Sequence, residues 1–235
     1  MKNSVLLITA VVSVLIAAVA ITILPDQIPA HFGLDGSADR IGSKYEVLIY
    51  SGIVIACAVM GILLRRKYER AQAVNAGHKA GAHSAGNAKI VVIVCAALGI
   101  VMIGLEIVFI CIGYNGLMQI SGTEAELYCS VTVILMGLLF AVLGNIMPKM
   151  KKNMLMGLRT TWSMKNDEVW ARCQRMGGTV MFFGGAATIL SGIILRGYPS
   201  LVAMMIIDLV MFAIMIKGSH QIYTDWEKEN GRENG

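Results

Sequence analysis

The sequence predicts an all-α fold, a polytopic integral membrane helical bundle with six transmembrane helices and both termini in the cytoplasm. Three observations support this prediction. The chain has 235 residues, of which 56% are hydrophobic and only 15% are charged. Its mean hydropathy is +0.68. The apolar residues gather into long runs, and the basic residues gather in alternate connecting loops. A soluble domain carries about 25% charged residues, so lipid is the solvent that this composition indicates.

Six apolar runs are long enough to be spans, because a helix needs about 20 apolar residues to cross the hydrocarbon core. They are residues 5–24, 47–64, 90–113, 127–147, 178–195 and 200–216. The first run contains a small-residue stretch at 18–20 that resembles a signal-peptidase site. It continues beyond that point, however, and is long for a secretory signal, so we expect an uncleaved first span.

The distribution of basic residues predicts the orientation. Loops 65–89 and 148–177 contain six and seven Lys or Arg residues, whereas loops 24–46, 114–126 and 196–199 contain two, none and one. Cytoplasmic loops carry the excess of basic residues. Loop 24–46 is therefore predicted to face outside, and loops 65–89 and 148–177 to face the cytoplasm. The net charge of +5 reflects membrane orientation and does not call for direct nucleic-acid binding.

The loops divide the chain into three predicted regions. Residues 1–64 form an N-terminal two-helix region, residues 65–89 a basic flexible cytoplasmic linker, and residues 90–235 a C-terminal four-helix region that includes cytoplasmic loop 148–177. In that loop, Asn166 is suited to cap a short helix that Gly177 and Gly178 would end. Two interpretations of this loop remain: an interfacial amphipathic helix, or a docking surface for a cytoplasmic partner.

Two carboxylates fall inside the apolar runs, Glu106 in the third and Asp208 in the sixth. An acid at the centre of a span costs about 3 kcal/mol on insertion scales, so it usually faces a cavity or a partner. We expect the two acids either to share a water-filled pocket reaching outward or to form hydrogen bonds between helices. Asn145, Thr188 and Ser191 are the partners considered for such bonds.

The sequence lacks the motifs of known hydrolases, P-loop proteins and zinc proteases, and we predict a protein that is not an enzyme and holds no cofactor. His31 with Asp35 and Asp39 resembles a metal-binding set only weakly, because the glycines between them indicate a turn-rich loop. The five cysteines show no CxxC pair and are predicted to be buried thiols.

Two stretches resemble known families. IPAHFGLDGSADRIGSK, residues 28–44, is similar to the IPxHFxxxGxxDxxGSK signature of a bacterial membrane domain of undefined role. GNIMPKMKKNMLMGLRTTWSMKNDEVWARCQRMGG, residues 144–178, resembles the signature of the SdpI/YfhL family, GNxMPKxKxNxxxGxRTxWTxxxxxVWxxxxRxxG. Ser163 replaces the usual Thr and keeps the hydroxyl group.

This resemblance implies a membrane immunity protein of the bacterial plasma membrane, giving resistance to a secreted peptide toxin or bacteriocin. It also implies a receptor that holds a cytoplasmic transcriptional repressor at the membrane. The implied toxin-facing or ligand-facing candidates are His31, Phe32, Asp35, Asp39, Glu106 and Asp208. The implied partner-docking candidates are Asn145, Pro148, Lys149, Asn153, Gly157, Arg159, Thr160, Trp162, Val169, Trp170 and Arg175.

Two other functions compete with immunity. The intramembrane acids Glu106 and Asp208 are typical of a small proton-coupled or ion-coupled transporter, although no inverted repeat is evident. An intramembrane hydrolase, with His31 or an acid activating water, is the third hypothesis.

Overall fold

The computed structural model describes residues 3–33, 36–75, 77–118, 122–153 and 155–231, and the side chains of all of these except 79–82 and 231. The helices are α1 (Ser4–Ile23), α2 (Val47–Val74), α3 (Lys79–Asn115), α4 (Thr123–Ile146), α5 (Asp167–Ile194) and α6 (Gly197–Gly231). Two strands, β1 (Gln27–Phe32) and β2 (Ala38–Ser43), and two short 3₁₀ helices, η1 (Lys44–Glu46) and η2 (Met147–Lys149), lie in the connections.

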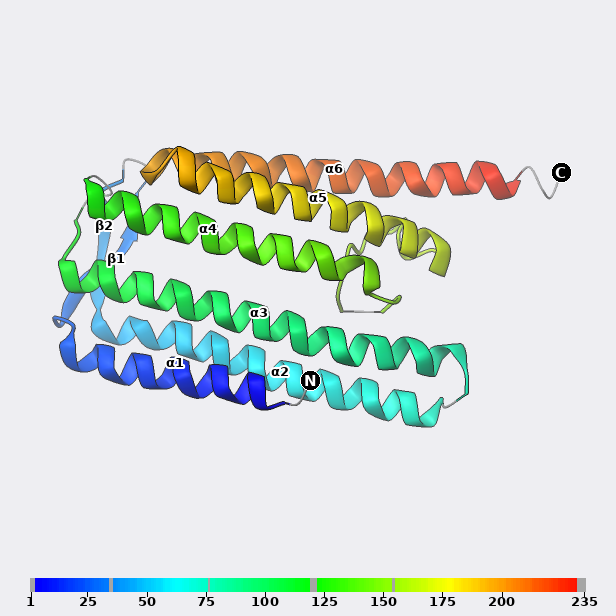
Figure 1. Cartoon of the computed structure of the whole chain (residues 1–235), viewed down its shortest axis with the longest axis horizontal. Coiled ribbons are helices and arrows are strands. Elements are labelled where there is room, and N and C mark those ends of the chain that lie inside the picture. Colours follow the sequence, from blue (N-terminus) through cyan, green and yellow to red (C-terminus); the bar gives the residue numbers. More distant parts are fainter. Residues whose placement is uncertain (1–2, 34–35, 76, 119–121, 154, 232–235) are drawn as a thin grey trace.

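The six long helices run alternately up and down a single elongated bundle, as Figure 1 shows. Each is long and apolar enough to cross a membrane, which confirms the six predicted spans and the all-α class. One end of the bundle carries the β1–β2 hairpin, and we call it the hairpin end. The other end carries the segment between α4 and α5 and both termini. The prediction that the hairpin end faces outside and the other end faces the cytoplasm stays a prediction.

Four helices are much longer than a bilayer requires. Helices α2, α3, α5 and α6 have 28, 37, 28 and 35 residues, or roughly 42 to 55 Å at 1.5 Å per residue. The hydrocarbon core is about 30 Å thick. The extra turns of α2, α3 and α6 extend from the end opposite the hairpin.

The predicted flexible linker at 65–89 is mostly helical. Helix α2 continues to Val74, and Asn75 closes it with a bond from its Nδ2 to the carbonyl of Ala71, 2.9 Å. Helix α3 already begins at Lys79. Ala, Arg, Lys, Glu and Gln are strong helix formers and fill most of this segment, and Arg65 pairs with Glu69 one turn on at 2.6 Å. The richness of this segment in Ala, Gly, Ser and Asn favoured a flexible linker, but most of its described residues are helical.

The prediction for α5 was right at its start and wrong at its end. The side chain of Asn166 accepts hydrogen bonds from the backbone N–H groups of Glu168 and Val169, as an N-cap does. The helix then continues through Gly177 and Gly178 to Ile194. A Cβ atom at Gly178 would stand 2.6 Å from the carbonyl oxygen of Gly144 on α4. These glycines allow two helices to approach closely and do not end one.

The helices pack as two groups of three. Helices α1, α2 and α3 contact one another, helices α4, α5 and α6 contact one another, and α3 against α4 joins the groups. This packing suggests that the boundary between the N-terminal and C-terminal regions of the chain falls between α3 and α4. The sequence analysis placed this boundary at the linker, residues 65–89. Large apolar side chains on the outer faces remain exposed, such as Leu15 of α1 and Leu209 of α6, as expected for surfaces that contact lipid.

Candidate functional site

The hairpin end begins with a two-stranded sheet in loop 24–46. Strands β1 and β2 pair antiparallel, with irregular register around His31. His31 Nδ1 lies 2.6 Å from Asp39 Oδ1, and both side chains are exposed. Asp35, the third member of the predicted set, lies outside the described residues. The structure therefore brings together one His–Asp pair on an exposed strand surface.

Ion pairs fix the base of the hairpin. The guanidinium of Arg40 donates to both carboxylate oxygens of Glu46, each at 2.8 Å. Lys44 Nζ lies 2.9 Å from Asp26 Oδ1. The hydrogen bond and charge of Lys44 lower the pKa of Asp26, and the hydrogen bond and charge of Glu46 raise the pKa of Arg40. These exposed pairs position the strands and contribute little to stability.

Apolar contacts dock the hairpin on the helices. The side chain of Ile28 is fully buried in a cluster with Ala17, Leu24 and Val47. The backbone N–H of Ala38 donates to the carbonyl of Met118, at 2.8 Å, just after α3. The hairpin is thus held over the ends of the helices.

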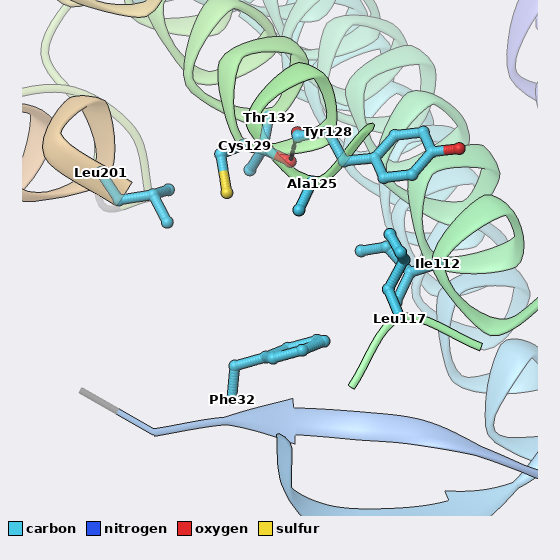
Figure 2. Close-up of a pocket in the computed structure, with 8 residues that line it drawn as sticks. All are labelled: Phe32, Ile112, Leu117, Ala125, Tyr128, Cys129, Thr132 and Leu201. Atoms are coloured by element: carbon cyan, nitrogen blue, oxygen red, sulfur yellow. Dashed lines mark hydrogen bonds between the residues drawn. The ribbon is translucent and has the colours of Figure 1, made fainter. Parts of the chain in front are cut away.

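An apolar pocket of about 140 Å³ lies beneath the hairpin. Figure 2 shows the ring of Phe32 rising from β1 toward residues of α4 and the segment that follows α3. The lining residues are Phe32, Ile112, Leu117, Ala125, Tyr128, Cys129, Thr132 and Leu201. The hydroxyl of Thr132 donates to the carbonyl of Tyr128 within α4, so the pocket suits an apolar side chain more than a polar one.

The opposite end carries an irregular segment, residues 150–153 and 155–166 of the described chain, which we call the signature segment. Its turns are closed by its own side chains. Asn153 Oδ1 accepts from the N–H groups of Leu155 and Met156 at 2.8 and 2.7 Å. Ser163 Oγ donates to the carbonyl of Leu158 at 2.8 Å. The segment is therefore folded with defined turns and is not an extended linker.

Two buried residues of α5 anchor the signature segment. Trp170 is 2% exposed, and its indole N–H donates to the carbonyl of Met150 at 2.8 Å. The side-chain amide of Gln174 is fully buried and bonds to both the N–H and the carbonyl of Leu158. Gly157 has a φ of +98°, and a Cβ there would stand 2.5 Å from Gln174 Oε1. This position therefore favours glycine.

Helices α3 and α6 hold the segment from two further sides. The side chain of Asn87 pairs with the N–H and carbonyl of Lys151. Trp162 meets His220 of α6 edge to face, with ring centroids 4.7 Å apart. Arg172 bonds to Glu229 at 3.1 Å, so the far end of α6 lies along the start of α5.

The eleven predicted docking residues divide by burial. Val169 and Trp170 are buried, and Asn153, Thr160 and Trp162 are partly buried. The exposed members are Asn145, Pro148, Lys149, Gly157, Arg159 and Arg175. Trp170, one of the predicted docking residues, lies in the protein interior, where its indole N–H finds a backbone partner.

Glu106 forms a buried polar cluster on the other side of the bundle. Ser13 Oγ of α1 donates to Glu106 Oε2 at 2.6 Å, and Ser51 Oγ of α2 donates to Oε1 at 3.0 Å. Glu106 is fully buried. Glu106 therefore forms hydrogen bonds between helices, which was one of the two expectations for it. Its partners are Ser13 and Ser51, and the residues considered from the sequence were Asn145, Thr188 and Ser191.

Asp208 differs from Glu106 in both place and partners. It lies on α6, which packs against α4 and α5, while Glu106 lies among α1, α2 and α3. In the described part of the chain, the two acids therefore lie in different groups of helices. Within the described part of the chain, Asp208 Oδ1 is buried without a hydrogen-bond partner.

Several residues that build these sites were missed in the sequence. Ser13 sits in a buried stripe with Thr9 and Ala17, four residues apart, a spacing that could have revealed a helix-contact face in the first span. Gln174 and Asn87 carry no such signal, because single amides near the ends of spans are common.

Two family models match the chain. Residues 149–218 match the SdpI/YfhL protein family, and residues 8–55 match a domain of unknown function, DUF1648. Neither a curated protein nor a solved structure matches. The first match covers the signature segment, α5 and most of α6, and the second covers α1, the hairpin and the start of α2. Together with the six spanning helices, they identify a multi-pass cell-membrane protein and confirm the resemblance to the SdpI/YfhL family.

Proposed function

We propose that this protein protects the cell membrane that contains it from a secreted peptide toxin. The family match supports a membrane immunity function at the level of the family. The observation that carries the proposal for this chain is the apolar pocket beneath the hairpin, with Phe32 as one wall. It lies at the end of the bundle that the basic residues predict to face outside, where a toxin would arrive.

The hairpin forms one wall of this pocket. Phe32 is only partly buried, and the β1–β2 hairpin is fixed at its base by exposed ion pairs. A pocket of about 140 Å³ accepts a single apolar side chain of a peptide, with His31 and Asp39 on the exposed surface beside it. Burying one such side chain contributes about 1.5–3 kcal/mol, so the hairpin surface would supply the remaining contacts.

A killing assay tests this proposal. A toxin-sensitive Gram-positive strain expresses the full chain, or carries an empty vector, and is challenged with the secreted membrane-active peptide of this family. We expect the expressing strain to survive. Phe32→Ala should reduce protection while the protein still reaches the membrane at wild-type levels, with Ile41→Ala, an exposed residue of β2, as the matched control. Equal killing of the expressing and empty-vector strains would contradict the proposal.

We further propose that the other end of the bundle docks a cytoplasmic repressor. The exposed Lys149, Arg159 and Arg175 offer a basic surface supported by the folded signature segment. Arg159→Ala with Arg175→Ala should abolish recruitment of the repressor to membranes, measured by co-sedimentation. Arg66→Ala, an exposed basic residue of α2, is the control. Unchanged recruitment by the double variant would contradict this role.

A transporter remains a second candidate because of one observation: among the described residues, Oδ1 of Asp208 is buried and has no hydrogen-bond partner. An acid in this setting is typical of proton or ion pathways. Substrate-dependent proton flux that disappears in Asp208→Asn would favour transport. Protection from toxin that is retained in the same variant would separate the two functions.

A further inference from the structure

A second pocket lies at the hairpin end, on another face of α4. It has a volume of about 380 Å³ and lies between the start of α4 and the end of α5. The polar groups in its wall include Glu124, Glu126, Ser130 and Arg196. Gly192 of α5 forms part of the wall as well, and a Cβ there would stand 3.2 Å from the carbonyl of Ser130.

The acids alone would not indicate a binding site. Glu124 and Glu126 lie in the first turn of α4, where carboxylates stabilise a helix by interacting with its dipole. Ser130 adds an independent observation. It is only 8% exposed, and within the described residues its Oγ is buried with no hydrogen-bond partner. A buried hydroxyl without a partner costs about 1–3 kcal/mol, which a bound donor would recover.

The charges of the pocket favour a cation. In the part of the chain that the structure describes, the carboxylates of Glu124 and Glu126 and the guanidinium of Arg196 form no ion pair with one another. Two carboxylates against one guanidinium leave a net negative charge in the wall. Arg196 has a φ of +46°, in the left-handed region, at the tight turn into α6. Its position is therefore set by the turn and not by pairing with the acids.

The two pockets of the hairpin end share one helix. Ala125, Cys129 and Thr132 of α4 face the apolar pocket beneath Phe32, while Glu126 and Ser130 face the acidic pocket. At 3.6 residues per turn these two sets lie on different faces of α4, about 110° apart around the helix axis. A peptide that crosses the end of α4 can therefore place one side chain in each pocket.

We propose that the acidic pocket binds a lysine or arginine side chain of an extracellular peptide whose neighbouring apolar side chain occupies the pocket beneath Phe32. This inference rests on the proposed function and adds the chemistry of the ligand to it. Ser130 Oγ accepts a hydrogen bond from the bound cation, and the two glutamates supply the charge. Membrane-active amphipathic peptides commonly carry Lys or Arg on one face and apolar residues on the other.

The test uses the full chain in phosphatidylcholine nanodiscs and two fluorescent amphipathic probes, one built from leucine and lysine and one with glutamine at every lysine position. The neutral lipid removes attraction between the probe and the bilayer charge. We expect the protein to bind the lysine probe more tightly than the glutamine probe, above empty nanodiscs. The double variant Glu124→Gln/Glu126→Gln should lose about tenfold in lysine-probe affinity, because each ion pair near a surface contributes up to about 1 kcal/mol.

Three further variants sharpen this test. Ser130→Ala should weaken binding of the lysine probe by a few fold. Arg196→Gln should strengthen it, because a positive charge leaves the pocket wall, and this opposite change cannot arise from damage to the fold. Asp225→Asn, an exposed acid at the far end of α6, is the control and should bind as the wild type does. Equal affinity for the two probes, or unchanged affinity in the double glutamine variant, would overturn the proposal. The immunity proposal would instead fail in the killing assay with the wild-type chain, so the two failures are distinct.

Discussion

The two ends of the bundle are built in different ways. The signature segment is held by buried side chains, with the indole of Trp170 and the amide of Gln174 each bonded to its backbone. The hairpin is held by exposed ion pairs and one buried isoleucine, and it stands over an apolar pocket. The comparison shows that the buried residues of the motif richest in recognisable residues hold its fold, while its exposed residues form the surface of this end. The two pockets that we propose to bind a peptide lie at the other end, where the recognisable pattern is shorter.

The largest expected effect comes from Trp170→Ala. It removes a large buried side chain and leaves the carbonyl of Met150 without its donor. Losing such an aromatic residue costs about 3–5 kcal/mol. We expect a large fall in the melting temperature of the solubilised chain, measured by intrinsic fluorescence. Trp162→Ala, a partly buried tryptophan of the same segment, is the matched control and should lower it much less.

An equal fall in melting temperature in Trp170→Ala and Trp162→Ala would contradict the difference drawn between the two ends of the bundle. It would mean that the signature segment derives its stability from its surface contacts with α6 and not from the buried anchor.

A smaller loss is expected for Gly157→Ala. The backbone there has a φ of +98°, and the new Cβ would meet the amide oxygen of Gln174. Strain in the backbone and the displaced amide together should cost about 2 kcal/mol. Hydrogen exchange of the Leu158 amide, which bonds to Gln174, should become faster. Gly77→Ala also has a positive φ but nothing within 4 Å of the new Cβ, so it separates backbone strain from the collision.

Exchange at Leu158 that is as slow in Gly157→Ala as in the wild type would show that the Gln174 bond does not depend on the glycine.

The sequence predicted the helices better than the sites. Apolar runs of about 20 residues are a strong signal, and all six spans were found. The end of α5 was missed because Gly177 and Gly178 serve either to stop a helix or to let another helix approach, and only the position of Gly144 on α4 decides which. The serine partners of Glu106 were missed because they come from spans 93 and 55 residues away in sequence. Trp170 and Arg159 belong to the same sequence motif, yet Trp170 is buried and Arg159 is exposed, and the motif alone did not predict this difference.

The smallest expected effect lies at the base of the hairpin. Lys44 lowers the pKa of Asp26 through a hydrogen bond at 2.9 Å. A carboxyl whose pKa is lowered by folding adds stability above its unfolded pKa of about 3.9, and this stability is lost as the pH falls through the lowered value. We expect the pKa of Asp26 to lie below its unfolded value in the wild type and to rise toward that value in Lys44→Gln, as followed by NMR of labelled aspartate. Because Asp26 is 91% exposed, salt should screen much of the difference, and the stability of the bundle should not change measurably.

The helices do not depend on this pair, so the hairpin can loosen in acid while the signature segment, anchored by Trp170 and Gln174, stays folded. An Asp26 titration that is the same in both proteins would mean that the backbone bond from Lys44 N–H to the Asp26 carbonyl, and not the ion pair, holds the base of the hairpin.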